Sequence, residues 1–188
     1  MIEIYRIVVE SESSLILLDN GFTEELRRVL SGCREVEDWE PPLFRLESGA
    51  GDGLVGTPCG TFAIPEHLAA NIRLMECLEL SGELLPIELD TGERYQILSP
   101  TGCVNSLNTT ESVFGDSGSQ QLGNRVILRH IFHPVRIPCS PIFRIPETHS
   151  IHIYASKHAR LHSESDFLTV YEEEGLTGLS FEKVWEGG

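Results

Sequence analysis

The sequence predicts an α+β protein, with short strands in a mixed or mostly antiparallel sheet and two or three helices. Several segments alternate apolar with polar residues or are rich in β-branched residues, which is typical of strands. Other segments carry apolar residues at helical spacing between start and stop signals. The order strand, helix, glycine, strand also occurs twice, over 62–89 and again over 151–185. This echo predicts two strand–helix–strand halves that share one core.

The N-terminal third of the chain predicts three strands and one short helix. The segments 2–10 and 14–19 are rich in Ile, Val and Leu and read as strands. A helix is expected at 23–32, because a threonine caps it, two glutamates follow and a glycine ends it. After an acidic loop, 43–48 is a short strand, and the glycine-rich stretch 49–60 is a surface loop.

The middle of the chain contains the clearest helix and a hairpin. A short strand at 61–64 leads into a helix at 65–80, which begins on a proline. Its expected buried stripe is Leu68, Ile72, Met75 and Leu78. The segment 84–98 is a hairpin, because its two alternating runs flank the turn sequence Asp-Thr-Gly-Glu.

The C-terminal half repeats the pattern after a polar stretch, 99–124, that carries little periodicity. Strands are predicted at 125–132, 142–145, 149–156 and 179–185. A helix, in one or two pieces, is expected over 157–174, with Gly175 as its left-handed stop. The whole chain, 1–188, is therefore interpreted as one domain with halves 1–98 and 99–188.

The net charge limits the kinds of partner. The chain of 188 residues has 29 acidic and 14 basic residues, a formal net charge of −15. Such a surface repels phosphate backbones, which argues against nucleic acid and favours a basic protein partner. No stretch approaches the roughly 18 apolar residues of a membrane span, and no signal peptide is evident at the start. A cytoplasmic protein that binds no membrane is expected, and its oligomeric state is left open.

One loop combines an aromatic residue with several carboxylates. The candidate partner-binding residues are Glu35, Glu37, Asp38, Trp39 and Glu40. An exposed tryptophan supplies affinity at an interface, while surrounding acids speed the encounter with a basic partner. The alternative is that Trp39 folds back into the core and the acids form a solvated rim.

A second segment is basic. Residues 117–146 contain no Asp or Glu in this acidic chain. The candidate anion-site residues within it are Arg125, Arg129, His130 and His133. The alternative is that these arginines pack across neighbouring strands and pair with glutamates.

Signatures of catalysis or metal binding are weak. His158 and His162 are four residues apart on a predicted helix, but no converging set of three or four ligands accompanies them. Cys139 with His133 has no local nucleophile signature, and Gly-Asp-Ser-Gly at 115–118 lacks the surroundings of a serine protease. The five cysteines are expected to be thiols, mostly buried. We therefore expect no catalytic residue, no metal and no cofactor.

The order of the parts resembles a known bacterial family. The resembling pieces are "PLFRLES" (42–48), "IPEHLAANIRLM" (64–75), "LLPIEL" (84–89), "RYQIL" (94–98), "PIFRIPETHSIHIYAS" (141–156) and "GLTGLSFEKVW" (175–185). The last two are the most specific. They are similar to the immunity proteins linked to polymorphic toxins, a family long described only as a domain of unknown function and common in myxobacteria.

The resemblance implies a protein that binds a cognate toxin stoichiometrically and is not an enzyme. No catalytic residue belongs to the family pattern, so none is carried over. Two positions depart from that pattern: Pro65 stands where the family often has serine, and Asn105 and Asn108 stand near its usual aspartate. Two alternatives remain: a small enzyme with an anion site in 125–144, and an interaction domain without a toxin.

Overall fold

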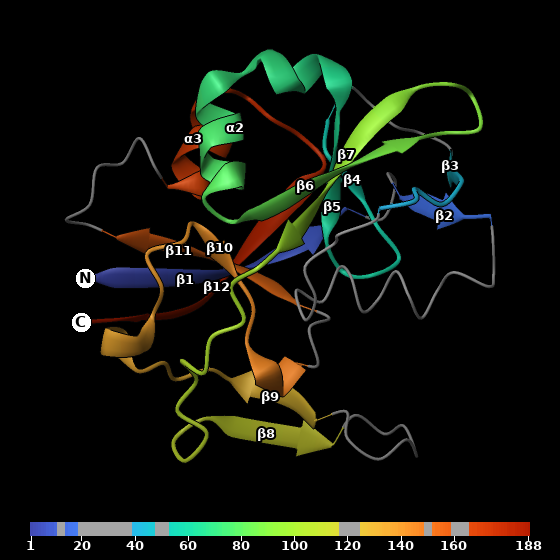
Figure 1. Cartoon of the computed structure of the whole chain (residues 1–188). Coiled ribbons are helices and arrows are strands. Elements are labelled where there is room, and N and C mark those ends of the chain that lie inside the picture. The colour runs from blue at the N-terminus through green and yellow to red at the C-terminus, as the bar shows by residue number, and fades with distance from the viewer. Residues whose placement is uncertain (11–13, 19–38, 48–52, 117–124, 149–151, 159–165) are drawn as a thin grey trace.

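Figure 1 shows the computed structural model of the chain. It describes residues 1–10, 14–18, 39–47, 53–116, 125–148, 152–158 and 166–188. The strands in these ranges are β1 (Ile2–Val9), β2 (Leu15–Leu17), β3 (Phe44–Leu46), β4 (Val55–Gly56), β5 (Phe62–Pro65), β6 (Gly82–Glu88), β7 (Arg94–Pro100), β8 (Val113–Asp116), β9 (Arg125–Arg129), β10 (Ile142–Phe143), β11 (Ile153–His158) and β12 (Leu179–Gly187). The helices there are α2 (Ile72–Glu79) and α3 (Phe167–Glu173), with 3-10 turns η2 (Glu66–Ala70), η3 (Pro134–Arg136) and η4 (Pro146–Thr148).

The α+β class predicted from the sequence is confirmed. The described strands form two four-stranded sheets and two strand pairs, and every ladder between them is antiparallel. Parallel pairing in the described part of the chain is confined to isolated bridges. The helix expected at 23–32 lies outside the described residues.

The first sheet joins the two ends of the chain. Its order is β10-β11-β1-β12, and Ile2 of β1 pairs with Gly187 of β12, so the termini lie close together in Figure 1. Because side chains alternate along a strand, Ile4 and Ile7 point to opposite faces of β1. Each belongs to a different core cluster, so this sheet is covered on both faces.

The second sheet is extended into a ring of strands. Its order is β4-β5-β7-β6, and Phe44 of β3 bridges to Leu89, just beyond β6. β3 pairs with β2, and Ser14, next to β2, bridges back to Gly56 of β4. The six strands therefore close on themselves around an apolar interior. That interior consists of Leu15, Phe44, Val55, Ala63, Leu85, Ile87, Leu89, Tyr95 and Ile97.

The largest core cluster contains residues from both halves of the chain. It lies between the helices α2 and α3 and the faces of both four-stranded sheets, and it combines residues from 54–98 with residues from 142–179. Phe62 of β5 stacks on Phe167 of α3, with ring centroids 5.6 Å apart. A ring pair of this kind stabilises the contact beyond its buried area.

A third cluster is aromatic and covers the other face of the first sheet. Phe132 is at its centre and makes edge contacts with Phe143, Tyr154 and Trp185. The hairpin of β8 and β9 lies on this side of the molecule, at the bottom of Figure 1, and Phe114 and Ile127 pack from it onto the cluster. The polar stretch 99–124 therefore supplies strand β8, which its sequence did not predict.

The helix predicted at 65–80 is interrupted. Residues 66–70 form the 3-10 turn η2, and α2 begins after Asn71, whose side chain accepts a hydrogen bond from the Leu74 N–H at 3.0 Å. Because α2 begins only after Asn71, the residues that face the core differ from those expected for one continuous helix. Ile72, expected to be buried, is 72% exposed, whereas Leu74 and Cys77 are buried.

The helix predicted at 157–174 does not begin at Lys157, and residues 159–165 lie outside the described part of the chain. β11 continues to His158, so Lys157 and His158 belong to a strand and not to a helix. His162 lies outside the described residues, and the helical His158–His162 pair is therefore not supported. The α3 helix ends as predicted: Gly175 has φ of 63°, and the Leu176 N–H donates back to the Tyr171 carbonyl at 3.0 Å.

The prediction that the cysteines are mostly buried is wrong for the described ones. Cys77 is buried in the shared core, and burial raises the pKa of its thiol to about 11. Cys103 and Cys139 are exposed, and Cys59 is half-buried. The two exposed cysteines lie in segments between strands, where local periodicity says little about burial.

Candidate binding groove on the second sheet

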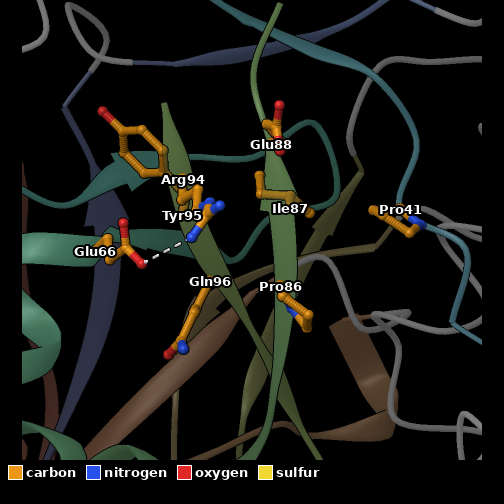
Figure 2. Close-up of a pocket in the computed structure, with 8 residues that line it drawn as sticks. All are labelled: Pro41, Glu66, Pro86, Ile87, Glu88, Arg94, Tyr95 and Gln96. Carbon is orange, nitrogen blue, oxygen red and sulfur yellow. Dashed lines mark ion pairs between the residues drawn. The ribbon is translucent and has the colours of Figure 1, made fainter. Parts of the chain in front are cut away.

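A hollow of about 390 Å³ lies over the β6–β7 hairpin. We call this hollow the β6–β7 groove. It is lined by Pro41, Glu66, Pro86, Ile87, Glu88, Arg94, Tyr95 and Gln96. Figure 2 shows Pro86, Ile87 and Glu88 on one strand and Arg94, Tyr95 and Gln96 on the next, with Pro41 on the far side of β6.

The groove arises where the hairpin extends beyond its helix. Leu84 and Leu98 are cross-strand partners that pack into the core beneath the helices. Along the same face the next pairs are Pro86 with Gln96, and then Glu88 with Arg94. The face therefore changes from apolar and covered to polar and open within four residues of each strand.

Pro86 reflects the edge position of β6. A proline cannot donate a hydrogen bond to a neighbouring strand, so it is tolerated in a strand that is paired on one side only. β6 is an outer strand of its sheet. The carbonyl oxygen of Pro86 accepts a hydrogen bond from the indole Nε1–H of Trp39 at 2.7 Å.

Trp39, the centre of the predicted partner-binding loop, therefore borders this groove. Its ring is half-buried and packs against the interior of the strand ring, while Glu40 beside it is exposed. Pro41 follows and lines the groove. The other candidate residues of this loop, Glu35, Glu37 and Asp38, lie outside the described residues.

Carboxylates outnumber cations around the groove. Glu66 and Glu88 line it together with a single basic residue, Arg94. Arg94 and Glu66 are 3.7 Å apart, and their side chains are 67% and 66% exposed. An ion pair this long and this exposed contributes little, so both groups are available to a partner.

One polar atom of the groove is unsatisfied. The side-chain oxygen Oε1 of Gln96 is buried and has no hydrogen-bond partner within the described structure. A buried acceptor without a donor carries a desolvation cost of about 1–3 kcal/mol. The carboxylates, the amide oxygen and the proline rings together form a surface suited to binding a side chain.

The lining of the groove contains no serine, cysteine or histidine. Across the described part of the chain, no group of three or more His, Cys, Asp or Glu residues is placed to hold a metal ion. The chemistry that its residues offer is recognition by charge, hydrogen bonding and apolar contact.

The anion-site candidates that the structure describes lie in different surroundings. Arg129 is exposed, and its guanidinium donates to the Glu111 carbonyl at 3.3 Å. His130, the next residue, is 6% exposed and lies in the aromatic region of the third cluster. His133 is half-buried, and the side chain of Arg125 lies outside what the structure describes.

His130 is placed as a neutral core residue. Its Nε2 shares a hydrogen bond of 3.2 Å with the Tyr154 hydroxyl, and its ring stacks on Phe132. Burial, with a smaller contribution from the positive charge of Arg6, lowers the pKa of His130 to about 4. At neutral pH it therefore carries no charge with which to attract an anion.

Arg144, from the same basic segment, is 1% exposed. Its backbone N–H donates to the Gly102 carbonyl at 2.7 Å, which ties β10 to the segment after β7. Arg144 is therefore packed in the core, whereas Arg129 of the same segment is exposed.

Sequence reasoning missed most of the groove. Only Trp39 and Glu40 beside it were singled out, although Pro86 within an alternating run was a usable signal of an edge strand. Which part of a strand remains uncovered depends on the helix that packs above it, and no local pattern reports that.

Comparisons with known proteins do not assign this chain to a family. No family model matches it, and no match is found among curated proteins. Within the described residues, no helix combines the length and apolarity that crossing a bilayer requires.

Proposed function

We propose that this chain is an immunity protein that binds and neutralises a cognate protein toxin stoichiometrically, acting in the cytoplasm. The observation that carries the proposal is the β6–β7 groove beside Trp39. It is an open, acidic recognition surface that joins an aromatic residue to apolar prolines and exposed carboxylates. Its mechanism is to cover the toxin surface, with no chemical step.

Two further observations support this function. The sequence resembles polymorphic-toxin immunity proteins over most of the chain after residue 40, including the segment 175–185 that closes α3 and begins β12. The formal net charge of −15 suits association with a basic toxin, because opposite charges speed diffusional encounter.

The alternative of a small enzyme receives no support from the basic segment. Its central histidine is neutral and buried, and Arg129 lies on the exposed surface. The proposed binding role rests instead on the groove, where exposed carboxylates and proline side chains line one surface.

The proposal is tested with the product of the neighbouring gene, which under this proposal is the cognate toxin. We expect the two purified proteins to form a complex of one copy each and the toxin's activity to fall to background at equimolar ratio. Complex formation is measured by calorimetry and light scattering, with an unrelated toxin as the control. Absence of a complex, with toxin activity unchanged by an excess of this chain, would contradict the proposal.

Replacement of Trp39 by alanine is expected to weaken toxin binding by about 2 kcal/mol or more, roughly 30-fold in Kd. The change removes an aromatic anchor and leaves the Pro86 carbonyl without its donor. Binding kinetics should show the loss mainly as faster dissociation.

Trp39→Phe is the matched variant, because it keeps the ring contact and removes only the N–H donor. It should lose less affinity than Trp39→Ala. Both variants are first shown to be folded by circular dichroism and thermal melting. Unchanged affinity in a folded Trp39→Ala protein would remove this face from the interface.

A further inference from the structure

We propose that the β6–β7 groove is a recognition site for an arginine side chain of the partner protein. This inference rests on the proposed function and specifies the chemistry of the contact. The partner's guanidinium lies against Glu66 and Glu88, and the apolar part of its side chain lies along Pro86 and Pro41.

Charge is the first argument. Two carboxylates and one guanidinium line the groove, and the exposed carboxylate of Glu40 adds to its rim. Since Arg94 is only loosely paired with Glu66, at 3.7 Å, it leaves negative charge unneutralised. The glutamates therefore attract an incoming cation and repel an incoming carboxylate, which only Arg94 attracts.

Hydrogen bonding is the second argument. Gln96 lines the groove, and its Oε1 has no partner within the described structure. The last torsion of a glutamine side chain is broad, so the amide can turn its oxygen toward a donor in the groove. A guanidinium N–H supplies that donor and removes the cost of the unsatisfied acceptor.

The shape of the cation is the third argument. A guanidinium carries five N–H donors in a planar fork, so it can bond to more than one oxygen acceptor. An ammonium group is a compact charge with a strong hydration shell. Pro86 and Pro41 also line the groove, and they offer apolar contact to the aliphatic part of the arginine side chain.

The test is an NMR titration of the isotopically labelled chain with Nα-acetyl-arginine methylamide. We expect the amide signals of β6 and β7 near Glu88, Arg94 and Gln96 to shift in a saturable manner. The neutral citrulline analogue, which has nearly the same shape, should shift them far less. The lysine analogue should bind more weakly than the arginine analogue.

Variants identify the groups responsible. The double variant Glu66→Gln, Glu88→Gln should bind the arginine analogue roughly fivefold more weakly, because two exposed charge contacts are lost. The matched control is Glu76→Gln, Glu79→Gln on α2, because both residues are exposed and neither lines the groove. It should bind like the unchanged chain.

The outcomes separate this inference from the proposed function. Shifts confined to other surfaces, an equal response to citrulline, or equal weakening by the control variant would overturn the arginine site. If the toxin binds and only the analogue fails, this inference is wrong and the immunity function stands. If the analogue binds in the groove but the toxin forms no complex, the function is wrong.

Discussion

Replacement of Gly178 by alanine is expected to lower the free energy of unfolding by about 3 kcal/mol or more. Gly178 has φ of 96°, a conformation that side chains disfavour. An added Cβ would lie 1.8 Å from the Leu54 carbonyl oxygen, which is backbone and has little room to move.

Hydrogen bonds fix the backbone around Gly178 and Leu54 in the unchanged chain. The Leu54 N–H donates to the Thr177 carbonyl at 2.8 Å, and the Glu10 N–H donates to the Gly178 carbonyl at 3.1 Å. Gly178 therefore joins the start of β12 to the end of β1 and to the chain entering β4. An added methyl group must break these bonds or displace Leu54, which is fully buried.

Gly175→Ala is the matched control for this experiment. It introduces the same methyl group three residues earlier, at φ of 63°, where an added Cβ meets nothing within 4 Å. Only the backbone penalty remains, so its cost should be about 1 kcal/mol. Both values are measured by urea unfolding followed by circular dichroism. Equal losses for the two variants would show that the Leu54 contact is unimportant.

Stability is also expected to fall as the pH decreases from about 6.5 to about 4, with His130 contributing up to about 3 kcal/mol. Burial and the nearby charge of Arg6 lower the pKa of His130 from 6.5 to about 4 in the folded chain. Above pH 6.5 the imidazole of His130 is neutral in both the folded and the unfolded chain, so its full contribution to stability is present. Between the two values the unfolded state binds the proton more readily, so unfolding becomes easier.

The contribution of His130 is isolated by substitution. His130→Phe keeps an aromatic ring beside Phe132 but binds no proton, so the fall in stability between pH 6.5 and 5 should become shallower. His152, whose pKa burial also lowers, faces the same Arg6 and Glu182, and His152→Asn measures its share. Urea unfolding at each pH gives the curves. An unchanged slope in the folded His130→Phe variant would show that the histidine is not held neutral.

Some elements followed from local patterns alone. The β-branched residues in 2–10 predicted β1, and the alternation in 84–98 predicted the β6–β7 hairpin, in which Leu85, Ile87 and Leu89 share the buried face. The glycine at 175 ended α3 in the left-handed conformation. In these cases one strand face or one dihedral angle decides the structure, and neighbouring residues carry that information.

The candidate site was predictable only in part. Trp39 and Glu40 were recognised because an aromatic residue among carboxylates is unusual in composition. Glu66 and Gln96 were not, because they come together only when β5, β7 and η2 meet. Likewise, the sequence did not show that His130 is buried while Arg129, the residue before it, is exposed.

What the sequence determined by itself was the α+β class, the positions of the main strands and the left-handed end of α3. Only the tertiary structure decided that the helix breaks at Asn71, that β11 continues to His158 and that six strands close into a ring. It also decided that His130 is buried and that the outer end of the hairpin stays open. The reason is physical. Propensity and alternation act over a few residues, whereas burial depends on which distant surfaces pack together and where that packing stops.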